Sequence, residues 1–254
     1  LGEGARTEHD ALRYLAAYQG AIEAIAANKA SSPQNADGIS IKLSALFCRY
    51  EDAQRERVFA TLLPRVWTLI DAAARANMNL TIDAEEVDRL ELSLDVFEAL
   101  VGRIAQTHPQ WQGFGLAIQA YQTRAIEVID EVARIAKANK LRFMVRLVKG
   151  AYWDGEIKRA QELGLAGYPV FTHKQHTDIA YLAGAQALIG HAEVIYPQFA
   201  THNAGTLAAI VQMAQRANAP FELQRLHGMG EGVYREFIRA HPNTPLRIYA
   251  PVGE

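Results

Sequence analysis

The stretch FMVRLVKGAYWDGEIKRAQ, residues 143–161, decides the fold and points to the site. Its first part, 143–148, is apolar except for Arg146, and such a run between helical patterns is typical of a strand buried in a parallel sheet. A guanidinium keeps its proton, so a buried Arg146 requires a polar partner at the strand end. That partner is either a core carboxylate or a ligand. The second reading is favoured by Lys149 and by the small pair Gly150-Ala151, which lets backbone approach an anion or a planar ring.

The same unit, an apolar segment that ends on polar residues and is followed by a helix, recurs along the chain. The further strands are expected at 39–43, 80–82, 114–118, 193–199, 221–226 and 246–249. Strict alternation of strands and helices predicts a parallel sheet with right-handed crossovers.

Two of the expected helices, one before the first strand and one after it, have clear apolar faces. The first is expected over 8–27, with Leu12, Leu15, Ile22 and Ile25 on its buried side. The second is marked by apolar residues at spacings of three and four. These residues are Val58, Leu62, Val66, Leu69 and Ala73.

The alternation leaves a closed barrel or an open doubly wound sheet. An open nucleotide-binding sheet usually carries a glycine-rich GxGxxG turn, which the sequence lacks, whereas polar residues at nearly every strand end suit a barrel. A full barrel would need one more strand before Leu1 and one more helix after Glu254. We therefore expect an α/β protein, a (β/α)8 TIM-type barrel without its first strand and last helix. It forms one domain over 1–254, a fragment of a longer chain that opens on the loop 1–4.

Composition excludes several classes of protein. The chain has 254 residues, of which 50% are hydrophobic, enough for one domain with a full core. Its 26 basic and 28 acidic residues give a net charge of -2, so electrostatics do not favour nucleic acid or an anionic membrane as partner. The lone Cys48 excludes a disulfide framework and indicates a reducing compartment. No apolar run reaches the roughly 18 residues of a membrane span, and no signal peptide opens the sequence.

In a barrel the strand ends converge on one mouth. They supply Lys42, Asp83, Glu85, Gln119, Arg146, Lys149, Thr201, His202, Gln224, His227 and Tyr249. Several also have local explanations. Lys42 could extend along apolar surface to reach water, Asp83 could pair with Arg146 or Lys42, and Asn203 could cap a helix that begins at Ala204.

The types of side chain at the strand ends exclude several classes of reaction. No His-x-His pair occurs, so a metal site is not expected, and the sequence lacks both Gly-x-Ser-x-Gly and a base in register with Cys48. A Schiff-base aldolase that uses Lys42 or Lys149 stays open, as does a barrel that serves only as an assembly module. Cations, amides and one aspartate are better suited to a large anionic cofactor and a small charged substrate.

Eight motifs, in order and nearly end to end, resemble the proline dehydrogenase domain of the bifunctional flavoenzyme proline utilization A. They are ISIKLSAL, IDAEE, IQAYQ, RLVKGAYWDGEIKRAQ, YPVFTHK, YPQFATHN, LHGMGE and RIYAPVG. The resemblance implies a (β/α)8 barrel that binds FAD and oxidises L-proline to Δ1-pyrroline-5-carboxylate. Electrons then pass to a membrane quinone.

The resemblance also implies roles for individual residues. Catalytic roles fall to Arg146, beside the flavin N5, and to Lys42, Asp83 and Tyr249. Residues expected to bind FAD are Ala117, Gln119, Arg146, Lys149, Gly150, Ala151, Trp153, Thr172, Lys174, Thr201, His202, Asn203, Gln224 and Leu226. The substrate pocket is expected to comprise Lys42, Asp83, Tyr152, Leu226 and Tyr249.

The resemblance has further implications for partners and location. We expect a pyrroline-5-carboxylate dehydrogenase domain in the full chain, a cytoplasmic location with peripheral contact to the inner membrane, and no nucleic acid bound through this domain. The family grips the proline carboxylate with two arginines on its last helix, which lies beyond Glu254. Lys42 alone cannot reproduce that bidentate clamp. A protein of these 254 residues is therefore expected to bind proline poorly, which its KM would test against that of a longer form.

Overall fold

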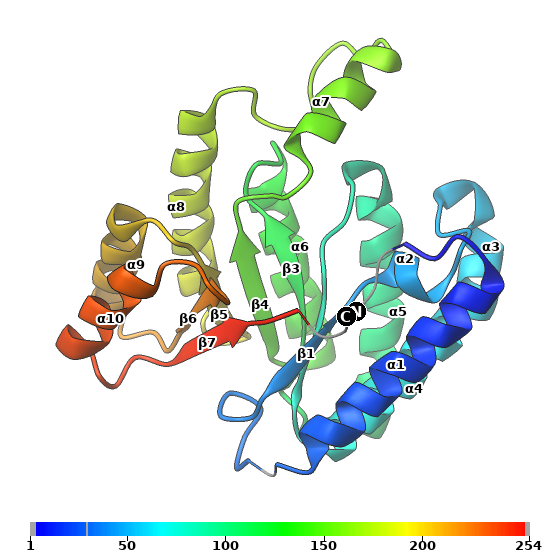
Figure 1. Cartoon of the computed structure of the whole chain (residues 1–254), viewed down its shortest axis with the longest axis horizontal. Coiled ribbons are helices and arrows are strands. Elements are labelled where there is room, and N and C mark those ends of the chain that lie inside the picture. Colours follow the sequence, from blue (N-terminus) through cyan, green and yellow to red (C-terminus); the bar gives the residue numbers. More distant parts are fainter. Residues whose placement is uncertain (1–3, 29, 252–254) are drawn as a thin grey trace. The chain divides into compact units, whose positions relative to one another are not determined.

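The computed structural model describes residues 4–28 and 30–251 (Figure 1). The start of the expected loop at 1–4 and the end of the last motif, at 252–254, lie outside these residues. The strands are β1 (Gly38–Ile41), β2 (Asn79–Ile82), β3 (Phe114–Gln119), β4 (Phe143–Val148), β5 (Ile195–Ala200), β6 (Glu222–Leu226) and β7 (Leu246–Tyr249). The helices are α1 (Glu8–Ala26), α2 (Leu43–Leu46), α3 (Arg55–Arg57), α4 (Leu63–Arg75), α5 (Leu90–Thr107), α6 (Ala125–Asn139), α7 (Trp153–Glu162), α8 (Lys174–Gly190), α9 (Ala204–Ala217) and α10 (Glu231–Ala240).

The seven strands pair in the order of the sequence, from β1 to β7, and the registers are parallel. Every strand expected from the sequence is present, but the segment at 193–199 begins later than predicted. Both Val194 and Ile195 donate their backbone N–H to the carbonyl of His191, at 3.0 and 2.9 Å. The end of α8 therefore uses these groups in a turn, and β5 starts at Ile195.

The chain divides into two compact units. Unit 1 comprises Leu1–Leu116 and Ile135–Met144, and unit 2 comprises Ala117–Arg134 and Val145–Glu254. Because β3 and β4 run from one unit into the other, each unit holds part of both strands.

Unit 1 has a core of aliphatic and aromatic side chains. The second predicted helix is confirmed over α3, a π-helical segment at Val58–Leu62 and α4, and its five predicted apolar residues are fully buried. The rings of Phe97 and Phe114 stack at 5.0 Å, and Phe143 meets Phe97 edge-on at 5.1 Å. Gly115 is required here, because a Cβ would lie 1.7 Å from the carbonyl oxygen of Met144.

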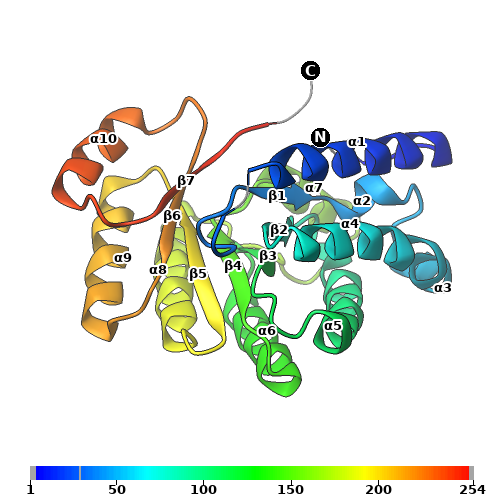
Figure 2. The same ribbon diagram turned by 90° about the horizontal axis from the view of Figure 1, so that it is seen from below.

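The buried face of α1 differs in part from the one predicted, since Ile22 is buried as expected but Leu12 is not. Leu12 is 50% exposed, whereas Ala11, Tyr18 and Ile22 are buried where α1 lies beside α4 (Figures 1 and 2). Tyr18 turns its hydroxyl inward and accepts the backbone N–H of Lys42, at 3.2 Å. A buried tyrosine with a polar partner therefore replaces a leucine in the predicted stripe.

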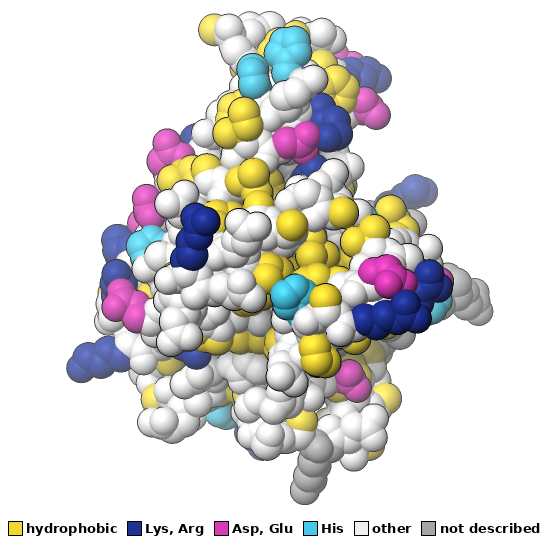
Figure 3. Space-filling view, turned by 90° about the vertical axis from the view of Figure 1, so that its left-hand side faces the viewer, with side chains coloured by type: hydrophobic (Ala, Val, Ile, Leu, Met, Phe, Trp, Pro, Cys, Tyr) yellow, Lys and Arg dark blue, Asp and Glu magenta, His cyan; other side chains and the backbone are white. Residues whose placement is uncertain are grey.

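Unit 2 places α8 and α9 side by side against β5 and β6 (Figures 1 and 2). Figure 3 faces the side that carries α8, α9 and α10 and shows hydrophobic side chains among charged ones. Exposed apolar residues of this unit follow β6, at Leu226 and Met229, and follow α7, at Leu163 and Leu165.

Candidate functional site

Two predicted site residues lie on adjacent strand ends in unit 1. Lys42 follows β1 and Asp83 follows β2, and the last residues of these strands, Ile41 and Ile82, are register partners. The backbone N–H of Asp83 donates to the carbonyl of Ile41 at 2.8 Å, which continues the pairing past the strands. A cation and an anion are thus carried by neighbouring backbone segments.

Glu85, two residues beyond Asp83, holds the short helix α2 that follows β1. Its carboxylate accepts the backbone N–H of Ser44 and a guanidinium N–H of Arg89, both at 3.0 Å. Burial raises the pKa of Glu85 above its ordinary value, and the bonds to Ser44 and the charge of Arg89 oppose the shift. This strand-end residue is therefore a structural support within unit 1.

In unit 2, Gln119 contacts the segment 149–151. We call the pair Gly150-Ala151 the bare backbone step, because Gly150 has no Cβ to cover the backbone. The buried Gln119 places its Oε1 to accept the N–H of Ala151 at 3.2 Å. Gly150 has a φ of 138°, and a Cβ on it would lie 2.4 Å from the ring of Tyr121. Only glycine fits there, so backbone lies directly on an aromatic ring.

Arg146 and Tyr249, both predicted as catalytic, lie together in unit 2. Arg146 is 7% exposed, and its guanidinium carbon is 4.9 Å from the centre of the Tyr249 ring. On β4, Arg146 is the register partner of Ala117, which places it one strand from Gln119. The aromatic face stabilises a cation that burial would otherwise disfavour.

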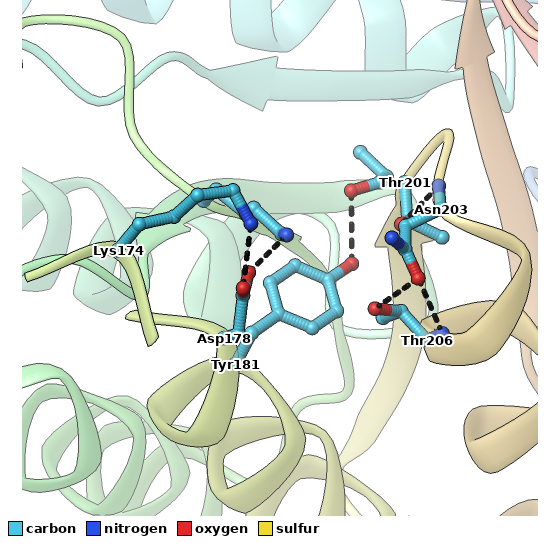
Figure 4. A network of polar contacts seen from close by, with 8 residues as sticks. Lys174, Asp178, Tyr181, Thr201, Asn203 and Thr206 are labelled. Carbon is cyan, nitrogen blue, oxygen red and sulfur yellow. Dashed lines mark hydrogen bonds and ion pairs between the residues drawn. The ribbon is translucent and has the colours of Figure 1, made fainter. Parts of the chain in front are cut away.

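Lys149 and Lys174 share one carboxylate that the sequence analysis missed. Asp178 Oδ2 lies 2.6 Å from Lys174 Nζ, and its Oδ1 pairs with Lys149 (Figure 4). The hydrogen bonds from Lys149 and Lys174 lower the pKa of Asp178. Lys174 and Asp178 are four residues apart on α8, so the spacing was visible in the sequence, but the third partner was not.

Thr172 and Trp153 are positioned by the segment that precedes α8. Phe171 donates its N–H to the carbonyl of Tyr121 at 2.8 Å, and the indole N–H of Trp153 donates to the carbonyl of Phe171 at 2.9 Å. The exposed Thr172 is therefore attached through Phe171 to the same Tyr121 that supports Gly150. Tyr152, half-buried, comes directly before α7.

The end of β5 is held by Thr201, His202 and Asn203. As predicted, Asn203 caps α9: its Oδ1 accepts the N–H of Thr206 at 2.9 Å. His202 Nε2 accepts the N–H of Leu226 at 3.0 Å, which requires a neutral imidazole with its proton on Nδ1. Desolvation, helped by the charge of Arg225, lowers the pKa of His202 and favours that state.

Two buried tyrosines that sequence reasoning missed bridge neighbouring strand ends. The hydroxyl of Tyr181, on α8, lies 3.1 Å from the carbonyl of Leu147 and 2.9 Å from that of Ala200. The hydroxyl of Tyr234, on α10, lies 2.7 Å from the carbonyl of Thr201 and 3.2 Å from that of Gln224. Each hydroxyl has one proton, which the two carbonyls share as hydrogen-bond acceptors. The aromatic residues were visible in the sequence, but not the carbonyls they would reach.

A buried carboxylate, Glu222, also escaped prediction. Its Oε1 accepts from the amides of Gln198 and Gln224, at 3.0 and 2.7 Å, and from Arg247 Nε at 2.8 Å. Arg247 also reaches its Oε2 at 3.1 Å. The network fixes the amide of Gln224, a predicted cofactor residue that is itself buried.

The family model for proline dehydrogenase matches residues 1–254. The chain belongs to the proline dehydrogenase family. It is 50% identical over 262 residues to the bifunctional protein PutA of Klebsiella aerogenes and, again over 262 residues, to that of Escherichia coli. All of this chain is covered in both cases, but it spans only about a fifth (20%) of the length of these relatives.

Solved structures agree with the family and the fold. A structure of proline utilization A with proline bound in remote sites is 52% identical and covers all of this chain and 26% of the other, with a TM-score of 0.96. Proline utilization A from Bdellovibrio bacteriovorus, inactivated by N-propargylglycine, is 30% identical, with a TM-score of 0.89, 100% of this chain and 28% of the other covered. These structures confirm the expected class, the α/β barrel of TIM type.

Proposed function

We propose that this chain carries the flavin-dependent oxidation of L-proline to Δ1-pyrroline-5-carboxylate, with electrons passed to a quinone. The observation that carries the proposal is the bare backbone step at Gly150-Ala151, beside Gln119 and one strand from the buried Arg146. A backbone step supported by an aromatic ring suits close contact with a planar ligand, and a fixed cation suits a ligand that gains negative charge.

The residues of unit 2 fit FAD in their chemistry. The missing Cβ of Gly150 lets the backbone pack on the ring of Tyr121, which fixes the segment that would contact the flavin, while Lys149 and Lys174 supply cations for a diphosphate. Bound flavin would supply the two-electron oxidant that takes a hydride from the carbon next to the substrate nitrogen. Arg146, held at Tyr249, would favour the electron-rich form of the cofactor. Thr201, His202, Asn203, Gln224 and Leu226 would hold the remainder of the dinucleotide.

Proline is a zwitterion, and the chain offers a group for each of its charges. We assign Asp83 to the substrate's nitrogen and Lys42 to its carboxylate, on the adjacent ends of β2 and β1. Within unit 2, we assign Tyr152, Leu226 and Tyr249 to contacts with the apolar part of the substrate. Lys42 offers one ammonium point charge rather than a planar fork, so it would bind the carboxylate less tightly than an arginine pair.

The Schiff-base aldolase alternative is less well supported for Lys149 than for Lys42. Lys149 lies in an ion pair with Asp178, whereas a Schiff-base lysine acts as a desolvated neutral amine. Lys42 has no such partner among the contacts of the described residues, so borohydride trapping should be tried at both positions. Labelling of either lysine in the presence of a carbonyl substrate would support the aldolase.

We extend the proposal to the longer protein. The relatives are named bifunctional and are about five times as long as this chain, which supports a second, pyrroline-5-carboxylate-oxidising domain elsewhere in the protein. Within residues 4–28 and 30–251, the structure contains no helix with the length and apolar character that a bilayer span requires. We propose a cytoplasmic protein that reaches the quinone through peripheral contact with the membrane.

One spectrum of the purified full-length protein tests the function. A flavin absorbance spectrum is expected, and proline should bleach it in the absence of oxygen, after which a soluble quinone should restore it. An aldolase or an assembly module would be colourless. A flavin spectrum that proline does not bleach would contradict the substrate assignment, and recovery with oxygen but not with quinone would contradict the acceptor.

A further inference from the structure

Asp178 joins two cations that come from different parts of unit 2. Lys149 follows β4, and Lys174 is the first residue of α8; each ammonium lies on a different oxygen of the same carboxylate (Figure 4). The side chain of Asp178 is 35% exposed, so the triad is open to a ligand. Two ammoniums and one carboxylate leave a net charge of +1.

The position of Lys174 is unfavourable without Asp178. A helix N-terminus carries a partial positive charge, which repels a cation in the first turn. The preceding residue, His173, provides no side-chain cap for α8, and the first turn contains no acidic residue. The side chain of Lys174 is 74% exposed, so without Asp178 its ammonium would extend into water. Asp178, one turn along the helix, is what keeps the ammonium at the helix start.

Tyr181 makes this arrangement rigid. It lies three residues after Asp178 on α8 (Figure 4), and its hydroxyl contacts the carbonyls of Leu147 and Ala200. Lys149 stands two residues after Leu147, so the helix that carries Asp178 and Lys174 is tied to the strand that delivers Lys149. Each ammonium has three N–H donors and gives one to Asp178, which leaves two for another anion.

We propose that Asp178 is a positioning residue that gathers Lys149 and Lys174 into one clamp for the diphosphate of the dinucleotide cofactor. The inference rests on the proposed function. A carboxylate next to a phosphate site repels the phosphate directly. Asp178 can therefore favour binding only if its main action is to hold the two cations in place. The inference also predicts that Asp178 acts on the phosphates and leaves the flavin ring unaffected.

The test measures binding of FAD and riboflavin to the flavin-stripped full-length protein by quenching of flavin fluorescence. Asp178→Asn should weaken FAD binding about tenfold, which is about 1.4 kcal/mol, and leave riboflavin binding unchanged. Asp178→Glu should restore most of the FAD affinity. In a Lys174→Met background, Asp178→Asn should have a clearly smaller effect than it has alone, because one of the two cations that it positions is gone.

A matched control is Glu162→Gln on α7. Glu162 pairs with Lys158 at 3.6 Å in the same i,i+4 arrangement, but it belongs to no proposed site. FAD affinity should stay within about twofold of the unsubstituted protein. Thermal unfolding of each variant verifies that the fold is retained.

The outcomes separate this inference from the proposed function. If the unsubstituted protein takes up FAD but Asp178→Asn leaves its affinity unchanged or tightens it, the positioning role is wrong and the function stands. Equal loss of FAD and riboflavin binding would also overturn it, because the effect would then be a general disturbance of unit 2. If the unsubstituted protein binds no flavin, both proposals fail.

Discussion

Glu85 in unit 1 and Glu222 in unit 2 are both buried carboxylates next to strand ends, and they are held by different partners. Glu85 follows β2, accepts a backbone N–H from Ser44 and an N–H from Arg89, and has a raised pKa because burial disfavours its charge. Glu222 lies within β6 and accepts from two glutamine amides and from two nitrogens of Arg247. The first carboxylate fixes the backbone of α2, and the second fixes other side chains.

The difference shows that the two units hold the segments at their strand ends with different kinds of group. In unit 1 the acid holds the backbone of α2, the short helix that directly follows Lys42. In unit 2 hydroxyls and amides, from Tyr181, Tyr234 and the Glu222 network, hold the strand ends, so that cations project from a rigid frame. Buried polar groups contribute most to rigidity when every member has a partner.

Glu222→Leu should give the largest loss of stability and should confine it to unit 2. Removal of one partner leaves Arg247 and two buried amides without their acceptor, which typically costs about 3–5 kcal/mol. Native-state hydrogen exchange should show faster exchange at the amides of β5–β7 than at those of β1 and β2. Glu222→Gln, which keeps an acceptor oxygen, is the control and should lose less. Equal loss in both units would show that the two units do not unfold independently.

Arg146→Met should give the next largest effect, on the reaction rather than on the fold. Loss of a fixed charge of this kind costs about 10²–10³ in rate. Anaerobic stopped-flow with proline should show slow bleaching of the flavin, and the flavin reduction potential should fall. Lysine at 146 would keep the charge but not the planar group that lies on Tyr249, so it should recover only part of the rate. Unchanged turnover would contradict a flavin-facing Arg146.

Tyr181→Phe and Tyr234→Phe compare the two tyrosines of unit 2. Each removes one buried hydroxyl and its hydrogen bonds to strand-end carbonyls, at about 1–3 kcal/mol. We expect Tyr181→Phe also to weaken FAD binding, because α8 carries Lys174 and Asp178, whereas Tyr234→Phe should mainly loosen β5 and β6. Burial raises the pKa of Tyr234 to about 12, so its hydroxyl should remain protonated up to pH 9. Equal effects on FAD binding would refute the special role of α8.

The smallest effects should appear in the pH dependence of stability and should have opposite signs in the two units. The raised pKa of Glu85 means that the folded state binds the extra proton, so its contribution to stability is lost as pH rises above the ordinary value of 4.5. The lowered pKa of Asp178 gives a contribution that is present above 3.8 and lost as pH falls further.

Unfolding midpoints in urea between pH 3 and 8 test these signs. Glu85→Gln should flatten the decline above pH 4.5, and Asp178→Asn should flatten the loss below pH 3.8. Because Asp178 is partly exposed, its effect should stay below about 1 kcal/mol. The same sign for both residues would mean that burial does not govern Glu85.

Much of the fold could be predicted, because its signals are local. Apolar segments with polar ends mark all seven strands, and the spacing of Val58, Leu62 and Val66 marks a buried helix face. The stripe on α1 was right at Ile22 but wrong at Leu12, because Leu12 and Ala11 are neighbours and only packing against α4 decides which side is buried. The start of β5 was wrong because the turn after α8 takes up two N–H groups.

The candidate site divides in the same way. Arg146, Lys149, Gly150 and the Asn203 cap could be found from residue type and position, since a buried cation, a glycine or a capping amide has few other uses at a strand end. Residue type and position in the sequence were therefore enough to predict the seven strands and the polar residues that follow them. Only the tertiary structure decided that Asp178 joins two lysines, that Glu222 holds Gln224 and Arg247, and that Tyr181 bridges two strands. Each of these groups includes a partner from a distant part of the chain: Lys149 lies 29 residues from Asp178, and Arg247 lies 25 residues from Glu222. No local periodicity encodes which carboxylate or hydroxyl will meet such a partner once the backbone has folded.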